Sequence, residues 1–88
     1  MISTNYVIQA AEGIHARPAT TLIRLAKKYK STVSLQKGDK LVRLNSMLNI
    51  LALGAKGGET ITVIVEGEDE VAAAAEIDLF FTEQLSHL

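Results

Sequence analysis

The chain has 88 residues, of which 48% are hydrophobic and 22% charged, and it contains no cysteine. This length supports one hydrophobic core and excludes two, so we expect a single domain over residues 1–88. The composition excludes disulfides and thiolate metal sites, and no apolar run reaches the roughly 20 residues that span a bilayer. Because the sequence begins without a basic region followed by an apolar stretch, we expect a cytoplasmic protein without a signal peptide.

The formal net charge of −1 conceals a segregation of charge along the chain. All nine Lys and Arg residues lie before Gly58, whereas eight of the ten acids lie from Glu59 onward. We interpret the acidic part as a solvated C-terminal helix. The bases favour steering of an acidic protein or anion, and they include Arg17, Arg24, Lys27, Lys28 and Lys30. Nucleic acid is disfavoured because the four aromatic residues are not interleaved with the bases.

The first elements in chain order are a strand and a helix. Alternation around Tyr6 and Ile8 predicts a strand near residues 3–9. Pro18 is tolerated only in a first helical turn, so a helix must begin within about two residues of it. The expected apolar face of this helix consists of Ala16, Ala19, Leu22, Ile23 and Ala26.

A hairpin and a short helix follow. Residues 32–36 and 41–44 read as two strands joined by turn residues 37–40. Ser46 is a favoured N-cap and Gly54 a favoured residue just past a helix end, which predicts about two helical turns between them.

The remaining elements are a strand over residues 60–66, expected to be central, and a last helix with Asp69 as its N-cap. The predicted buried stripe of that helix consists of Ala74, Ile77, Phe81, Leu85 and Leu88. The order βαββαβα predicts an α+β fold, in which a four-stranded antiparallel sheet is covered on one face by three helices. The other sheet face would be solvated, as in an open-faced sandwich.

The segment Gly13-Ile14-His15-Ala16-Arg17-Pro18-Ala19-Thr20 combines a glycine, a titratable ring, an arginine and the only proline at the first helix start. A helix start offers unpaired N–H groups and the positive end of the dipole, which favour an anion. A histidine there can accept a phosphoryl group, because the dipole also keeps its ring neutral and nucleophilic. The plainer alternative is that His15 merely caps the helix.

This eight-residue segment resembles the active-site motif of the HPr family, the histidine-containing phosphocarriers of the phosphoenolpyruvate:sugar phosphotransferase system. The resemblance spans all 88 residues, with a segment around Ser46 that is more like the Gram-positive branch. It implies that His15 accepts a phosphoryl group on Nδ1 from phosphorylated enzyme I and passes it to enzyme IIA domains, without enzymatic turnover of its own. Arg17 would contact the phosphoryl oxygens. The resemblance implies neither a cofactor nor a metal.

Ser46 carries a second expectation beside its role as an N-cap. In Gram-positive members this position is phosphorylated by HPr kinase/phosphorylase, and the phosphorylated form binds a catabolite-control transcription regulator. Asn45 and Asn49 stand where those members often carry Lys and Gly, so the regulatory role stays open, whereas the N-cap role holds in either case.

The resemblance also implies a docking surface for partners on the first and the short helix. The two helices would contribute Thr20, Arg24, Lys27, Met47, Leu48 and Leu51. The short helix cannot bury every apolar side chain, so we favour docking over core packing for Met47 and Leu48, whereas Leu51 suits both. Arg24 and Lys27 would raise the encounter rate more than the affinity.

Two other functions are compatible with the resemblance to the HPr family. A nitrogen-related HPr paralogue would use the same chemistry on regulatory targets, although the Ser46 segment favours the sugar branch. An HPr-like regulatory binding module would lack the phosphorylatable histidine, so the presence of His15 disfavours it. No feature of the sequence indicates oligomerisation, and we expect a monomer without nucleic acid or membrane partners.

Overall fold

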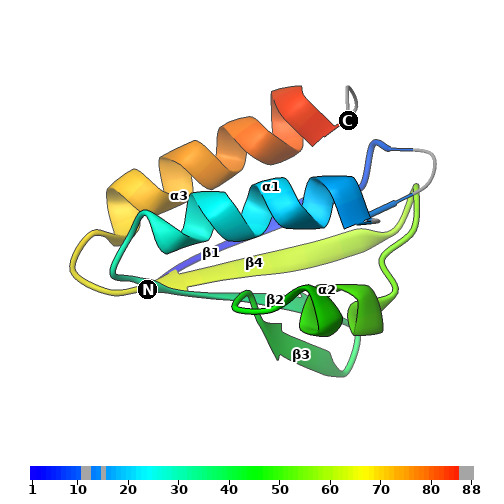
Figure 1. Ribbon diagram of the computed structural model, residues 1–88, viewed down its shortest axis with the longest axis horizontal. Helices are drawn as coiled ribbons and strands as arrows, with labels where there is room; N and C mark the ends of the chain where they lie inside the picture. The colour runs from blue at the N-terminus through cyan, green and yellow to red at the C-terminus, as the bar shows by residue number, and fades with distance from the viewer. Residues whose placement is uncertain (11–12, 15, 86–88) are drawn as a thin grey trace.

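The computed structural model describes residues 1–10, 13–14 and 16–85 (Figure 1). In chain order the elements are β1 (Ile2–Val7), α1 (Ala16–Lys27), β2 (Thr32–Lys37), β3 (Lys40–Arg43), α2 (Met47–Leu53), β4 (Thr60–Glu66), α3 (Glu70–Leu79) and a π-helical turn η1 (Phe80–Gln84). The predicted order βαββαβα is confirmed. Helix α1 begins two residues before Pro18, which places the proline in the first turn, where its missing N–H is not needed.

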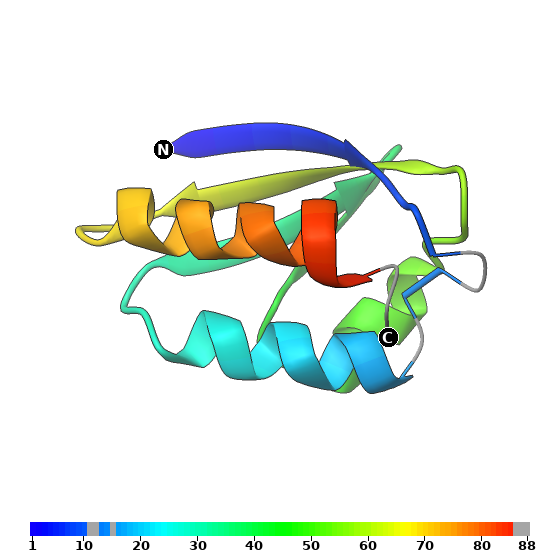
Figure 2. The ribbon, with the colours of Figure 1, turned by 90° about the horizontal axis from the view of Figure 1, so that it is seen from above.

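The four strands form one antiparallel sheet in the order β1-β4-β2-β3. Strand β4 pairs with both β1 and β2, so its predicted central position is confirmed. Its alternating pattern buries Ile61, Val63 and Val65 beneath the helices, which lie on one side of the sheet (Figure 2). The other face is mostly polar, with Val7 and Leu41 exposed among its side chains, and there the Thr62 hydroxyl donates to Asn5 Oδ1 at 2.7 Å. The open-faced architecture is therefore confirmed.

Helix α1 packs against α2 and α3, and its buried stripe is centred on Leu22. The predicted apolar face is partly wrong, because Ala16 is exposed and Ile23 is only partly buried, whereas Leu25 is buried. At 100° per residue, Ala16 lies about 120° around the helix from Leu22, outside the stripe, and Leu25 lies about 60° from it.

Helix α2 has the two caps that the sequence predicts. The Ser46 hydroxyl oxygen accepts a hydrogen bond from the Asn49 N–H at 3.2 Å. Gly54 ends the helix in the left-handed conformation, with φ of 68°. Ile50 and Leu53, which share one helix face by their spacing of three residues, are both buried.

Asp69 stands at the N-cap position of α3, as predicted, but its side chain makes no capping hydrogen bond there. Its carboxylate instead accepts hydrogen bonds from the Lys30 N–H at 2.8 Å and from the Ser31 N–H at 2.9 Å, and a third from the Ser31 hydroxyl. The bonds from the Ser31 hydroxyl and the Lys30 N–H hold the pKa of Asp69 below its usual value. Asp69 therefore joins the turn before β2 to the turn before α3.

The predicted buried stripe of the C-terminal helix is confirmed in part, because Ile77, Phe81 and Leu85 are buried. Ala73 is fully buried and Ala74 only partly, and both Phe80 and Phe81 are buried. Phe80 and Phe81 lie three and four residues after buried Ile77, so helical spacing places both on the buried face. In η1 the Leu85 N–H bonds to the Phe80 carbonyl five residues earlier, and Leu85 is also buried. The prediction thus missed Phe80, and its remaining member, Leu88, lies outside the described residues.

Candidate functional site

The loop that leads into α1 is fastened to the loop that follows α2. The Ile14 N–H donates to the Ala55 carbonyl at 3.1 Å, and the Gly13 N–H donates to the Ala10 carbonyl at 2.9 Å. Gly13 has φ of +74°, and a Cβ atom on it would lie 2.1 Å from the Ala55 carbonyl oxygen. Only glycine fits this close approach. Because the Ile14 side chain is buried, the loop is anchored by packing as well as by backbone hydrogen bonds.

The first turn of α1 has one packed side and one open side. Pro18 and Ala19 are buried, whereas Ala16 and Arg17 are exposed. The first N–H groups of an α-helix have no acceptor within the helix and lie at the positive end of its dipole. An exposed guanidinium on the same turn adds a full positive charge. This end of α1 therefore suits an anion such as a phosphoryl group.

The predicted site residues on α1 are exposed or half-buried, and the predicted acceptor, His15, lies outside the described residues. Arg17, Arg24 and Lys27 are exposed, and no ion pair joins them to another residue within the described ranges. Thr20 is half-buried, and its hydroxyl donates to the Ala16 carbonyl at 2.9 Å.

The predicted basic side of the molecule is partly neutralised by the acidic half of the chain. Lys28 Nζ lies 2.9 Å from a Glu76 carboxylate oxygen, and Lys30 Nζ lies 3.3 Å from Glu68. The Tyr29 hydroxyl also donates to Glu76, and this bond together with Lys28 lowers the pKa of Glu76. The acids are therefore not only solvated, because they neutralise Lys28 and Lys30, whereas the exposed bases of α1 lie in its first turn (Arg17) and its last turn (Arg24 and Lys27).

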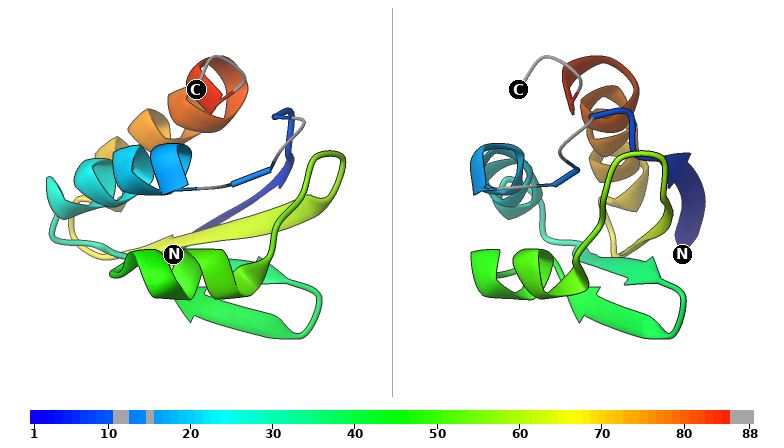
Figure 3. Two further views of the ribbon diagram at one scale, coloured as in Figure 1. Left: turned by 45° about the vertical axis from the view of Figure 1, so that its right-hand side comes forward. Right: turned by 90° about the vertical axis from the view of Figure 1, so that its right-hand side faces the viewer.

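The apolar residues of α2 divide between the core and the surface. Leu48 has 79% of its surface exposed and Leu51 has 42%, whereas Met47 is partly buried against the core. Helix α2, which carries these leucines, packs beside α1, which carries Arg17, Arg24 and Lys27 (Figure 3). An apolar patch beside a basic helix face is a suitable surface for an acidic protein partner.

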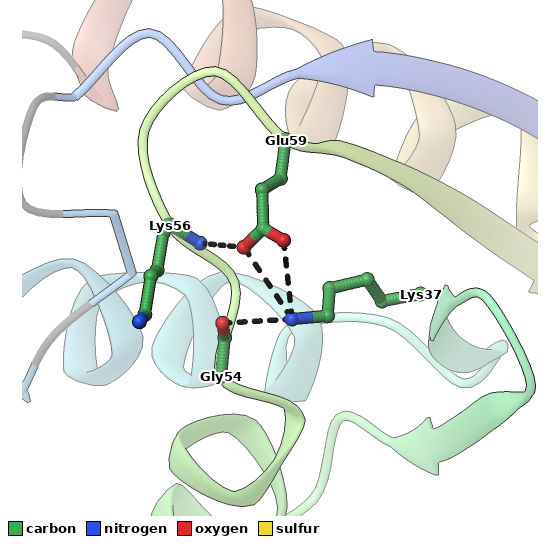
Figure 4. Close-up of polar contacts among 4 residues, drawn as sticks. All are labelled: Lys37, Gly54, Lys56 and Glu59. Carbon is green, nitrogen blue, oxygen red and sulfur yellow. Dashed lines mark hydrogen bonds and ion pairs between the residues drawn. The ribbon is translucent and has the colours of Figure 1, made fainter.

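An ionic cluster that sequence reasoning missed supports the loop after α2 (Figure 4). Lys37 Nζ donates to the Gly54 carbonyl at 3.0 Å and lies 3.3 and 3.4 Å from the two carboxylate oxygens of Glu59. The Lys56 N–H donates to the same carboxylate at 2.7 Å, and this bond, followed by Lys37, lowers the pKa of Glu59. Lys37 and Glu59 lie 22 residues apart, and no periodic pattern links them.

Within residues 1–10, 13–14 and 16–85, no three His, Cys, Asp or Glu side chains are grouped so that they could hold a metal ion. No helix there is both long enough and apolar enough to cross a membrane.

Comparisons with known proteins agree on one family. A family model described as the PTS HPr component phosphorylation site matches residues 2–83. The phosphocarrier protein HPr of Borreliella burgdorferi is 34% identical over 77 residues, which cover 88% of this chain and 90% of the relative. An HPr crystal structure from Thermoanaerobacter tengcongensis is 32% identical, with a TM-score of 0.86 and coverage of 96% of both chains. A Bacillus anthracis HPr structure, 23% identical over 92% of this chain and 96% of that one, shares the fold with a TM-score of 0.85. The chain therefore belongs to the HPr family of phosphotransferase-system phosphocarriers.

Proposed function

We propose that this chain carries a phosphoryl group on His15, which it receives from phosphorylated enzyme I and passes to enzyme IIA domains during sugar uptake. The observation that carries the proposal is the position of the motif, because residues 13–20 run from the anchored loop through the first turn of α1. His15 thus immediately precedes, in sequence, a helix start that suits an anion.

Transfer requires a neutral imidazole as the nucleophile. The Nδ1 lone pair of His15 attacks phosphorus, and the bond between phosphorus and the donor breaks as the new N–P bond forms. The product carries a charge of roughly −2. The exposed Arg17 guanidinium and the N–H groups of the first turn of α1 would stabilise that charge by charge-assisted hydrogen bonds. The chain supplies no turnover of its own, since it is the acceptor in one step and the donor in the next.

A coupled assay tests the carrier role. Enzyme I, phosphoenolpyruvate, this protein and an enzyme IIA domain are mixed, and phosphorylation of the IIA domain is followed. We expect the IIA domain to be phosphorylated only when this protein is present, and not with the His15→Ala variant. A variant that still supports transfer would contradict the role of His15, and a wild type that supports none would favour a binding module.

We propose that partners dock on the open side of α1 and on the adjacent α2 patch. The exposure of Leu48 and Leu51 supports this assignment, and Met47 would contribute its accessible part. Arg24 and Lys27 would steer the acidic partner, which affects the association rate most strongly at low salt. Half-buried Thr20 would lie at the border of this surface.

We also propose that Ser46 is a regulatory phosphorylation site for HPr kinase/phosphorylase and that the product binds a catabolite-control regulator. Ser46 stands at the N-cap of α2, where its hydroxyl oxygen accepts a bond from the Asn49 N–H. Phosphate oxygens at this position would retain that acceptor function, so the added charge need not unfold the helix. Incubation with the kinase and ATP, followed by mass analysis, should place one phosphate on Ser46 and none on the Ser46→Ala variant.

We further propose that residues 1–88 act as one domain and as a cytoplasmic monomer. Sedimentation equilibrium should give the mass of a single chain, 9.5 kDa, across the accessible concentrations. A mass that rises toward twice this value would contradict the monomer.

A further inference from the structure

We infer that Lys37 is a positioning residue of the phosphoryl-transfer site. Its ammonium group, together with the Glu59 carboxylate, holds residues 54–59 in the position in which the Ala55 carbonyl accepts the hydrogen bond from the Ile14 N–H. The inference rests on the proposed function for its effect on transfer, but its structural part can be tested without any transfer reaction.

Lys37 joins three parts of the fold at one point (Figure 4). It ends strand β2, its Nζ donates to Gly54 at the end of α2, and it pairs with both oxygens of Glu59, the residue before β4. Helix α2 has no basic residue in its own last turn, so Lys37 supplies the cation that the negative end of the helix dipole favours. The Lys37 side chain is only 26% exposed, which reduces the screening of these contacts by solvent.

The same cluster closes the loop between α2 and β4. The Glu59 carboxylate accepts from the Lys56 N–H at 2.7 Å, and the Glu59 N–H donates to the Lys56 carbonyl at 3.1 Å. Lys37 therefore contacts the loop at its first residue, Gly54, and at its last residue, Glu59. Loss of the ammonium would remove a side-chain contact from each end of the loop, and the Gly54 end would lose its bond to β2.

Residues 54–59 are hydrogen-bonded to the segment that leads into α1. The Ile14 N–H donates to the Ala55 carbonyl, one residue after Gly54. At the other end of the loop, the Ile8 N–H donates to the Glu59 carbonyl at 2.8 Å, and the Gly58 N–H returns a bond to the Ile8 carbonyl at 2.9 Å. A displacement of residues 54–59 would thus move Ile14, which stands two residues before the start of α1.

The competing interpretation is an ordinary surface ion pair, which would contribute little to stability and nothing to the site. The two interpretations differ at the Ile14–Ala55 bond. A surface pair leaves the opening of that bond unchanged, whereas a positioning residue controls it. They also differ in kinetics, because positioning lowers kcat for phosphoryl transfer while leaving the KM for enzyme I, set by docking elsewhere, unchanged.

The test compares Lys37→Met with Lys40→Met, in which the replaced lysine is the exposed register partner of Lys37 across the hairpin. Native-state hydrogen exchange is measured at the Ile14 N–H, with the Val63 N–H in β4 as an internal reference for global stability. We expect the Ile14 exchange rate, relative to Val63, to rise by about fivefold or more in Lys37→Met and to stay unchanged in Lys40→Met. Transfer from enzyme I should lose a similar factor in kcat at constant KM, and Lys37→Arg should restore much of both.

Equal relative exchange at Ile14 in Lys37→Met and Lys40→Met would overturn the inference. Faster exchange with unchanged kcat would also overturn it, because the loop would then move without affecting the site. Glu59→Gln removes the other charge without changing the size of the side chain, and it supplies the same comparison if Lys37→Met does not fold. A wild-type protein that accepts no phosphoryl group would defeat the proposed function alone, since hydrogen exchange still tests the positioning of Ile14.

Discussion

The replacement Gly13→Ala probes the contact between the two loops at the candidate site. A Cβ atom at Gly13 would lie 2.1 Å from the Ala55 carbonyl oxygen and 2.7 Å from Lys56 Cα, both of which belong to the backbone. Neither atom can rotate away as the end of a flexible side chain would. The loops must therefore separate, and the bond from the Ile14 N–H to Ala55 must lengthen or break.

The expected cost has two parts that a second variant separates. Gly38 also has positive φ, at +58°, but a Cβ atom there meets nothing within 4 Å. Alanine in the left-handed backbone conformation lowers the free energy of unfolding by about 1–2 kcal/mol at either position. Only Gly13→Ala adds the overlap, which costs about 1–3 kcal/mol by analogy with overpacked cores. We therefore expect Gly13→Ala to lower the free energy of unfolding by about 2–5 kcal/mol, and Gly38→Ala by about 1–2 kcal/mol.

Urea denaturation of the wild type and both variants, followed by circular dichroism, measures this difference. Equal slopes of the three transitions would show that the compared states are the same. Alanine also restricts the unfolded chain more than glycine does, which stabilises the folded protein. This effect is common to both replacements, so it cancels when their free energies of unfolding are compared. If the two variants differ by less than about 0.5 kcal/mol, the close approach of Gly13 to Ala55 does not exist as described.

Four further predictions concern the docking surface, the core, the exposed bases of α1 and the hydrogen bonds of Asp69. Because Leu48 is exposed, Leu48→Ser should change the free energy of unfolding by less than about 0.5 kcal/mol while weakening enzyme I binding, measured by calorimetry. Ile50→Ala removes a buried side chain, so it should lower the free energy of unfolding by about 2–5 kcal/mol. Arg24→Glu together with Lys27→Glu should slow transfer from enzyme I, measured by quenched flow, most strongly at low salt, and an unchanged rate there would count against steering. The pKa of Asp69 is lowered in the folded protein, so its carboxylate stabilises the fold at pH values above its ordinary pKa of 3.8. This contribution is lost as the pH falls through the folded-state pKa. Asp69→Asn should therefore lower the urea midpoint at neutral pH and weaken its dependence on pH below about 4, and an unaltered acid profile would contradict the network.

Features set by local chemistry were predictable from the sequence. Pro18 restricts the start of α1 because of its own ring, and Ser46 and Gly54 end α2 through contacts within a few residues. The alternation of β4 likewise identified its buried face. The motif around Arg17 indicated an anion site because residue type and helix position act together over one turn.

Features set by contacts between distant segments were not predictable. Asp69 has the sequence context of an N-cap, yet its carboxylate is taken by Ser31, 38 residues away. The π-helical turn η1, in which the Leu85 N–H bonds to the Phe80 carbonyl, has no signal in the periodic pattern of the last helix. The contact of Lys37 with Glu59 depends on how β2, α2 and β4 meet in three dimensions, and a single sequence without aligned relatives carries no signal for it.

The central claim is that His15 accepts the phosphoryl group, and locating that group on the protein tests it most directly. The wild-type protein is incubated with enzyme I and phosphoenolpyruvate, and intact mass analysis is followed by fragmentation under conditions that preserve phosphohistidine. We predict one acid-labile phosphoryl group per chain, located on His15 and absent from the His15→Ala variant. A protein that takes up no phosphoryl group, or one that carries it on another residue, would contradict the account.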